Sequence, residues 1–231
     1  MLRQAGYADG LQVMPEVQSG SLQSCSCEAL QAIIDRLCDI SLHDALTGLV
    51  NTRYFKLALG REVDRVFRSG EIALLLLIDL DSFKEINDTY GHLVGDQALL
   101  TVAGVLTKNV RPMDTAARCG GDEFAVILPN CRPDTGRLIA ERIRMQVEQT
   151  PIALTDGRNV RMTTSIGGTH ISPSRKLVFE EVLDQADQQL YRAKSEGRNR
   201  VSLDVQAPVA APVSFDEKSQ LLDPFGRDSD E

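Results

Sequence analysis

Two adjacent carboxylates follow a double glycine near the middle of the chain, in the segment Gly120–Phe124. Gly-Gly is typical of a tight hairpin turn, because glycine reaches positive φ without steric cost. The turn would place Asp122 and Glu123 at a bend, beside backbone that carries no side chain. Carboxylates in such a place can hold a hard divalent cation and bring phosphate oxygens to it. An exposed surface turn has the same local sequence, so the interpretation depends on the rest of the chain.

A third carboxylate stands at the end of an apolar run. Ile72 to Ile78 are seven consecutive apolar residues, and Asp79 follows them directly. A short apolar run bounded by acidic residues is typical of a buried central strand, and α/β sheets bind ligands beyond the carboxyl ends of their strands. If the hairpin neighbours this strand, Asp79 and Asp122 can share one metal ion. The alternative is that Asp79 only caps the end of the strand or the start of a helix.

The rest of the pattern predicts the elements that would position these carboxylates. Apolar positions at helical spacing predict helices, and short runs of strand-forming residues predict strands. The expected helices cover 52–68, 84–90, 95–110, 134–149 and 179–196, and the expected strands cover 72–79, 115–118, 123–128, 162–169 and 200–203. Two strand–helix–strand halves indicate an α/β sandwich with a mixed central sheet and a ferredoxin-like core.

Both ends of the chain differ from this central part. Residues 1–24 lack periodicity and are expected to be flexible. Residues 25–43 are expected to form a short N-terminal stalk helix, with apolar residues spaced by three and four at Leu30, Ile33, Leu37 and Ile40. The stripe favours a dimerising helix, while a helix packed on its own domain would show the same stripe. The domain itself is expected over 44–203, followed by a disordered acidic tail over 204–231.

The composition argues against some classes of function. The formal net charge is −8, and residues 204–231 hold seven acidic and two basic residues, a net charge of −5. A protein that binds the nucleic-acid backbone needs a basic face, so we expect no nucleic-acid partner. No apolar segment approaches the roughly 20 residues of a membrane span, and the N-terminal residues lack the apolar core of a signal peptide. We therefore expect a cytoplasmic protein without a membrane span.

Five segments in order resemble the GGDEF family, the diguanylate cyclases. They are DALTGLVNTRYF (44–55), the segment 74–96, the GGDEF string itself, TTSIGG (163–168) and ADQQLYRAKSEGRNRV (186–201). One such motif is weak, but five in order over about Asp44 to Leu203 are specific. The resemblance implies a GGDEF fold, like that of nucleotide cyclases and polymerase palms, for this part of the chain. That expectation agrees with the sandwich predicted from the pattern.

The resemblance also implies a metal site and a catalytic carboxylate. Asp79, the carbonyl of Leu80 and Asp122 would bind Mg²⁺ or Mn²⁺, with two ions in each active half-site. Asp122 and Glu123 would be catalytic. Glu123 would act on the attacking hydroxyl, either as its base or as a second metal ligand.

Positions around the expected helix start at 83–84 would bind the substrate's phosphates. A loop that leads into a helix offers backbone N–H groups to phosphates, and Phe83 and Lys84 stand there. The resemblance gives Lys84 a catalytic role and adds Lys194 and Arg198 as further positive charges. Each of these three bases alone could be an ordinary surface residue.

Two further groups of residues would recognise guanine, by the same resemblance. Asn87 and Asp96 would read the guanine of GTP, because a carboxylate accepts from N1–H and N2–H and an amide supplies complementary hydrogen bonds. Arg111 and Asp114 match the family's inhibitory R-x-x-D site, with Arg142 from the next helix as a second arginine. The alternative is a solvated turn beside a helix-surface arginine.

The predicted function is that of a diguanylate cyclase, which condenses two GTP into cyclic di-GMP and releases two pyrophosphates. One domain would hold one GTP, so the site would be complete only in a homodimer. Cyclic di-GMP would inhibit through the R-x-x-D site. A separately encoded regulatory protein would bind the N-terminal helix, because the stand-alone layout is similar to that of SiaD-type cyclases.

Two other functions fit the same family. The first is a catalytically silent module that senses GTP or cyclic di-GMP and signals through contacts. The second is an adenylate or mixed-nucleotide cyclase on the same fold. The intact Asp122–Glu123 hairpin argues against the first, and Asn87 with Asp96 argues against the second.

Overall fold

The computed structural model describes residues 41–154, 157–174 and 177–204. Its described residues form a mixed six-stranded sheet with the order β1-β3-β4-β2-β7-β8. The strands are β1 (Val50–Asn51), β2 (Ala73–Leu80), β3 (Thr115–Arg118), β4 (Glu123–Pro129), β7 (Thr164–Ile171) and β8 (Val201–Leu203). β1 runs parallel to β3 and β8 parallel to β7, while the other neighbours are antiparallel.

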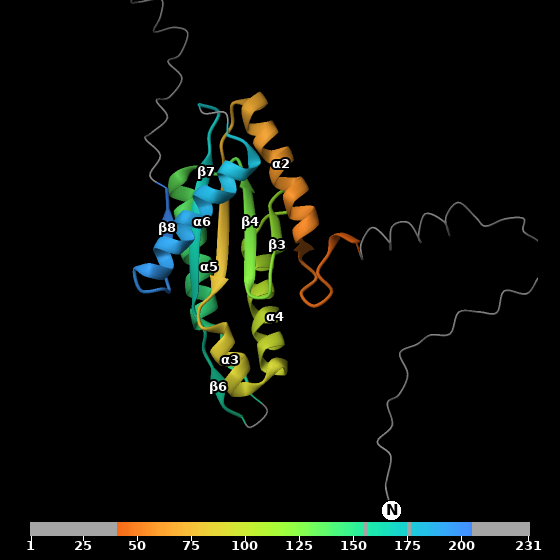
Figure 1. Ribbon diagram of the computed structural model, residues 1–231, viewed down its shortest axis with the longest axis vertical. Coiled ribbons are helices and arrows are strands. Elements are labelled where there is room, and N and C mark those ends of the chain that lie inside the picture. The colour runs from red at the N-terminus through yellow and green to blue at the C-terminus, as the bar shows by residue number, and fades with distance from the viewer. Residues whose placement is uncertain (1–40, 155–156, 175–176, 205–231) are drawn as a thin grey trace, which may run out of the picture. The chain divides into compact units, whose positions relative to one another are not determined.

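Helices cover both faces of this sheet (Figure 1). Helices α2 (Thr52–Ser69) and α6 (Phe179–Ser195) pack on one face, and α4 (His92–Asn109) and α5 (Pro133–Gln149) pack on the other. The short helix α3 (Phe83–Tyr90) follows the end of β2. The arrangement confirms the predicted α/β sandwich with a mixed sheet.

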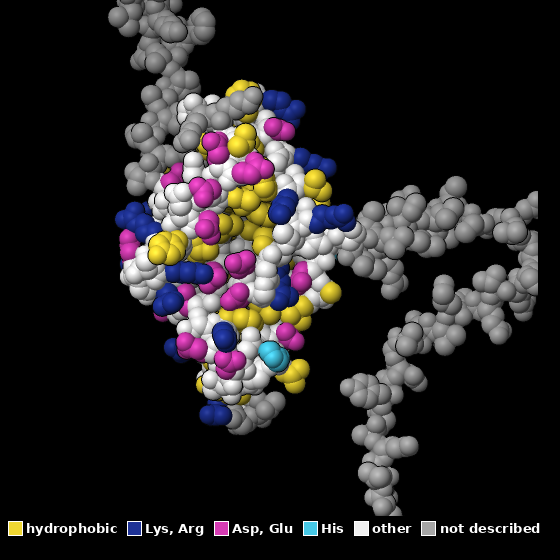
Figure 2. Space-filling view, in the orientation of Figure 1, with side chains coloured by type: hydrophobic (Ala, Val, Ile, Leu, Met, Phe, Trp, Pro, Cys, Tyr) yellow, Lys and Arg dark blue, Asp and Glu magenta, His cyan; other side chains and the backbone are white. Residues whose placement is uncertain are grey.

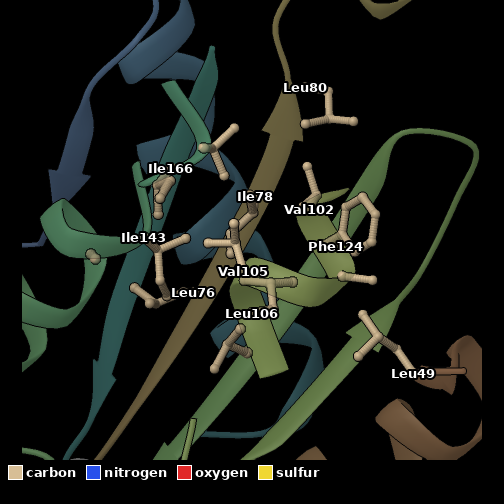
Figure 3. Close-up of a cluster of buried hydrophobic side chains, with 14 of the residues drawn as sticks. Leu49, Leu76, Ile78, Leu80, Val102, Val105, Leu106, Phe124, Ile143 and Ile166 are labelled. Carbon is tan, nitrogen blue, oxygen red and sulfur yellow. The ribbon is translucent and has the colours of Figure 1, made fainter. Parts of the chain in front are cut away.

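β2 is the centre of the core because both of its faces are covered. Leu74, Leu76, Ile78 and Leu80 point to the side of α4 and α5, where Figure 3 shows part of the cluster. Ala73 and Leu75 belong to the second cluster, under α2 and α6. Burying a leucine side chain contributes about 1.5–3 kcal/mol, so this run fixes the strand firmly. Its last two residues, Asp79 and Leu80, come out at one end of the sheet.

One close contact sets how α6 lies on the sheet. A Cβ atom on Gly167 of β7 would lie 2.0 Å from the backbone nitrogen of Leu190 and 2.4 Å from its Cα. Only a residue without a side chain lets the helix approach the strand so closely. The position of α6 matters for function because its C-terminal turn carries Lys194.

The observed elements differ from the predicted ones mainly at their ends. β7 begins two residues later than predicted, at Thr164, and α4 begins three residues earlier, at His92. Gly91, with φ of +85°, separates α3 from α4 and allows the earlier start. β1 and a separate pair, β5 (Ile152–Ala153) with β6 (Asn159–Val160), were not predicted. Two-residue strands carry no readable period.

The predicted ends of the chain lie largely outside the described residues. Of the stalk helix expected over 25–43, only Ser41, Leu42 and His43 are described, and the first two have helical backbone. The flexible segment 1–24 and the acidic tail after Asp204 are not described. The domain boundaries therefore remain predictions. In the described ranges, every helix is too short or too polar to cross a bilayer.

Candidate active site

The end of β2 and the start of β4 bring the predicted carboxylates together. β2 and β4 are antiparallel neighbours, and Asp79 pairs directly with Glu123 in their register. The backbone N–H of Leu80 donates to the carbonyl of Asp122 at 3.3 Å. Asp79 is buried, with 8% of its surface exposed, whereas Asp122 is half-buried and Glu123 is exposed. The sheet thus supplies one carboxylate from inside the domain and two from its surface turn.

The Glu123 carboxylate folds back onto the first glycine of the hairpin. The backbone N–H groups of Cys119 and Gly120 both donate to the carbonyl of Glu123, at 2.8 and 3.3 Å. A Cβ atom on Gly120 would lie 2.7 Å from Oε2 of Glu123. The Glu123 carboxylate therefore lies against bare backbone, as predicted, but neither Gly120 nor Gly121 has the positive φ that the Gly-Gly sequence led us to expect.

Asp79 forms an ion pair with a lysine of the last helix, α6. Nζ of Lys194, in the last turn of α6, lies 2.7 Å from Oδ2 of Asp79. Burial raises the pKa of Asp79 above its usual value, and although Lys194 opposes this, the charges of Asp122 and Asp81 add to it. Burial thus disfavours the charged form of Asp79 more than the ion pair with Lys194 favours it.

This donor set fits a divalent cation that retains open coordination positions. The described residues contain no cluster of three or more His, Cys, Asp or Glu side chains arranged to enclose a metal. They offer Asp79 and Asp122, with the Leu80 carbonyl in the adjoining peptide. Mg²⁺ commonly binds to one or two carboxylates and takes its other oxygens from water and substrate phosphates.

A second group of predicted residues gathers where α3 packs against α4. Ser82, with φ of +56°, begins α3, followed by half-buried Phe83 and exposed Lys84. The side chain of Asn87 reaches α4, since a Cβ atom on Gly95 would lie 1.9 Å from its Oδ1. Gly95 therefore makes room for Asn87, and Asp96 is the next residue, exposed to solvent. The structure brings the two predicted guanine-binding residues to the same helix junction.

Charges of both signs gather on one face of the domain. Figure 2 shows Asp and Glu side chains near the middle of the drawn face, below an apolar hollow, with Lys and Arg side chains at the left edge. Arg198 follows α6 in an exposed turn with φ of +61°. Lys194 and Arg198 thus come from one short segment, close to the end of β2 that carries Asp79.

The predicted inhibitory residues form a separate group at the other end of β3. The Arg111 backbone N–H donates to Oδ2 of Asp114 at 2.7 Å, and the Asp114 N–H donates to the Arg111 carbonyl at 2.9 Å. Burial raises the pKa of Asp114 although the N–H and charge of Arg111 oppose it. Arg142 on α5 donates to the side chain and carbonyl of Asn109, at 2.5 and 3.3 Å. Since Asn109 ends α4 two residues before Arg111, the structure brings Arg142 to the same end of the domain.

Two charged residues at the hairpin were missed in the sequence. Arg118 donates to the carbonyls of Gly120 and Gly121, at 3.2 and 2.8 Å, and pairs with Asp44 at 3.1 Å. Burial disfavours the charged form of Asp44, but hydrogen bonds from Thr47 and Arg118 outweigh it and hold the pKa of Asp44 below its usual value. The two residues connect the first turn of the domain to the carboxylate hairpin. Arg118 stands beside the glycines in the sequence and Asp44 opens the first family motif, but nothing in the sequence shows that these two residues, 74 positions apart, meet.

Comparison with known proteins agrees with this geometry. The family profile described as "Diguanylate cyclase, GGDEF domain" matches residues 41–200. The response regulator PleD of Caulobacter vibrioides is 40% identical over 168 residues, which cover 73% of this chain and 37% of PleD. The chain thus matches well under half of that relative.

Two solved structures have the same fold. The first, the coiled coil and GGDEF domain of DgcB from Caulobacter crescentus in complex with c-di-GMP, has a TM-score of 0.73 at 31% identity and covers 77% of this chain and 93% of that one. The second, the diguanylate cyclase SiaD in complex with its activator SiaC from Pseudomonas aeruginosa, has a TM-score of 0.69 at 30% identity. It covers 77% of this chain and 67% of that one.

Proposed function

This chain belongs to the GGDEF family of diguanylate cyclases, and on that premise we propose that it condenses two GTP into cyclic di-GMP and two pyrophosphates. The observation that carries the proposal is the register that pairs Asp79 with Glu123 beside Asp122. All three carboxylates stand at one end of the β2–β4 pair, and Asp79 contacts the Lys194 ammonium. This is the donor set that transfer of a nucleotidyl group requires.

The metal site of the proposal uses Asp79, Asp122 and the Leu80 carbonyl. They would hold Mg²⁺ or Mn²⁺, two ions in each half-site. When bound, the ions stabilise the attacking and leaving oxygens and orient the phosphates. The assignment is supported by the register, which places Asp79 and Leu80 at the end of β2 with the Leu80 N–H bonded to the Asp122 carbonyl.

The chain's own residues then orient the substrate. Lys84, Lys194 and Arg198 would contact the triphosphate, while Asn87 and Asp96 would bind guanine at the α3–α4 junction. In each half-reaction the ribose 3′-oxygen of one GTP bonds to the α-phosphorus of the other, and the bond to pyrophosphate breaks. Glu123 would stand at the attacking hydroxyl, as the base that takes its proton or as a ligand of the second ion.

The reaction further requires two copies of the domain. One domain would bind one GTP through one set of these residues. The carboxylate hairpins of two domains must therefore face each other. The homodimer is part of the proposal. We also propose that a regulatory protein acts on residues 1–43, and the known complex of SiaD with its activator SiaC supports that arrangement.

The test is incubation of the full chain with GTP and Mg²⁺, with the products identified by mass spectrometry. We expect cyclic di-GMP and pyrophosphate, and a specific activity that rises with protein concentration because the site is shared. ATP in the same assay should give no cyclic dinucleotide, because adenine lacks the N1–H and N2–H donors that Asp96 would accept. A folded chain that binds GTP but makes no product at any concentration would instead be a silent binding module.

Product inhibition is a second part of the proposal. Arg111, Asp114 and Arg142 would bind cyclic di-GMP at the end of the domain away from the hairpin. The turn supports this use, since the Arg111 backbone holds Asp114 and leaves the turn independent of the Arg111 side chain. An arginine can grip a phosphate and a guanine edge at the same time.

Arg111→Ala should therefore retain cyclase activity but lose tight binding of cyclic di-GMP. Removing a charged hydrogen-bond partner from an interface costs roughly 2–5 kcal/mol, which is several tens-fold or more in affinity. Titration calorimetry with cyclic di-GMP measures the loss, and Arg137→Ala, an exposed arginine on α5, is the matched control. Equal affinities for the unsubstituted chain and Arg111→Ala would exclude the inhibitory site.

A further inference from the structure

The second aspartate after the central strand has a buried place of its own. Asp81 is 7% exposed, and its carboxylate accepts three hydrogen bonds. The donors are Oγ1 of Thr163 at 2.7 Å, Oγ of Ser165 at 2.7 Å and the backbone N–H of Asn199 at 3.0 Å. The backbone N–H of Asp81 also donates to the carbonyl of Thr163. A buried carboxylate with every oxygen engaged fixes the segments that donate to it.

One of those segments has an unfavourable backbone conformation. Arg198 and Asn199 are consecutive and both left-handed, with φ of +61° and +47°. Residues with a Cβ atom rarely adopt this conformation, and arginine has no local hydrogen bond that favours it. Such a conformation persists only where surrounding contacts enforce it. Arg198 is also a proposed phosphate contact. The backbone conformation therefore sets the direction in which its side chain leaves the chain.

Hydrogen bonds to α6, α5 and the end of β2 hold this turn, and Nε of Arg200 donates to the Arg198 carbonyl at 3.3 Å. The Arg198 N–H donates to the carbonyl of Ala193 at 3.1 Å, a bond that closes the C-terminal end of α6. The Asn199 side chain lies between Arg144 and Glu148 of α5, at 2.7 and 2.9 Å. The Asn199 backbone N–H donates to Asp81. Among these contacts, the one with Asp81 ties the turn to the end of β2.

Asp81 also adjoins the other proposed phosphate segment. The next residue, Ser82, is left-handed as well, with φ of +56°, and leads into Phe83 and Lys84. A single buried carboxylate therefore stands between two constrained segments. One leads to Lys84 and the other to Arg198.

We propose that Asp81 is a positioning residue for the nucleotide triphosphate, which fixes the Arg198–Asn199 turn against the segment Ser82–Lys84. The inference rests on the proposed function, because it takes Arg198 as a phosphate contact. Asp81 acts through Arg198 and does not touch the substrate. Loss of Asp81 would release the turn, and Arg198 would have to be ordered again at each binding event, which weakens binding.

A different role for Asp81 would be electrostatic, since its charge also acts on Asp79. Asp81→Asn separates the two roles. The asparagine carbonyl can still accept from Thr163 and Asn199, while its amide donates to the Ser165 hydroxyl. Asp81→Ala removes both the contacts and the charge. A positioning role predicts that asparagine restores binding and alanine does not.

The experiment measures binding of 3′-deoxyGTP to the full chain with Mg²⁺, because this nucleotide lacks the attacking hydroxyl and is not consumed. We expect Asp81→Ala to weaken binding by about tenfold or more, as for a lost charged contact. Asp81→Asn should stay within about twofold of the unsubstituted chain. Guanosine, titrated by NMR, should bind Asp81→Ala and the unsubstituted chain alike, because it has no phosphates.

A double-mutant cycle shows whether Asp81 acts through Arg198. In the Arg198→Ala background, Asp81→Ala should weaken 3′-deoxyGTP binding by no more than about twofold. Asp187→Asn, at an exposed aspartate of α6, is the control and should bind normally. If thermal melting shows that Asp81→Ala does not fold, Thr163→Val replaces it. That variant removes one donor that orients Asp81, and it should give a smaller loss that also disappears in the Arg198→Ala background.

Three results would overturn the inference. They are additive effects of the Asp81 and Arg198 substitutions, an Asp81→Asn variant as weak as Asp81→Ala, or an equal loss of guanosine binding. Failure of the unsubstituted chain to bind 3′-deoxyGTP would overturn the proposed function itself, and this inference with it.

Discussion

Asp122→Ala and Asp79→Ala should each abolish synthesis of cyclic di-GMP while the domain stays folded. Each substitution removes one of the two carboxylates of the proposed metal site, and transition-state charge would lose its main stabilisation. Loss of a single group that stabilises such charge typically lowers kcat by about 10²–10³, and loss of a metal ligand should reach at least that range.

The structure explains why folding should survive these changes. The contact of Asp122 with the Leu80 N–H uses the Asp122 carbonyl, which alanine retains. Asp79 pairs with Lys194, whose side chain is 36% exposed and can be hydrated once its partner is gone. Neither position belongs to the hydrophobic clusters around β2. Circular dichroism and thermal melting should therefore resemble those of the unsubstituted chain.

Turnover should be measured in metal-stripped buffer to which Mg²⁺ is returned. Asp64→Ala, at an exposed aspartate of α2, is the control for loss of one negative charge and should keep full activity. Near-normal synthesis by either the Asp79 or the Asp122 variant would refute the metal assignment.

Gly167→Ala should destabilise the domain more than a typical single substitution. The added Cβ atom would lie 2.0 Å from the Leu190 nitrogen and 2.6 Å from the Ala186 carbonyl oxygen, both in the backbone of α6. A side chain can rotate away from such a clash, but a helix backbone cannot, so α6 must move off the sheet. Overpacking usually costs 1–3 kcal/mol and occasionally more, and we expect about 3 kcal/mol or more here.

Gly104→Ala is the matched control for the same chemical change. Gly104 lies within α4, and a Cβ atom there would meet nothing within 4 Å. Alanine favours helix over glycine by about 0.5–1 kcal/mol, so this variant should be slightly more stable. Urea unfolding of both variants gives the comparison. A Gly167→Ala variant as stable as the unsubstituted chain would show that α6 is not held at this distance from β7.

The features that could be predicted from the sequence are those that depend on residues close together in the chain. The apolar run ending at Asp79 specified a buried strand with a carboxylate at its exit, because hydrophobic burial acts on each residue of a run regardless of its partners. The double glycine correctly marked the position of the hairpin, although neither glycine has the positive φ expected of it. The helices were predicted within a few residues, since their periodicity is also local.

The tertiary structure decided which of these local features meet. The register of β2 and β4 pairs Asp79 with Glu123, and a shift of one residue would turn each side chain to the other face. Packing of α6 through Gly167 brings Lys194 to Asp79. These relations depend on strand pairing and helix contact between segments far apart, which no local pattern encodes.

The polar contacts that support the site are the clearest case. Asp81 meets Asn199 across 118 residues, and Arg118 meets Asp44 across 74. The sequence alone shows that Asp81 follows a strand and that Asp44 opens a motif, but it does not show what either residue contacts. A hydrogen bond requires its two atoms within about 3 Å of each other, and only the packed sheet and helices bring them to that distance.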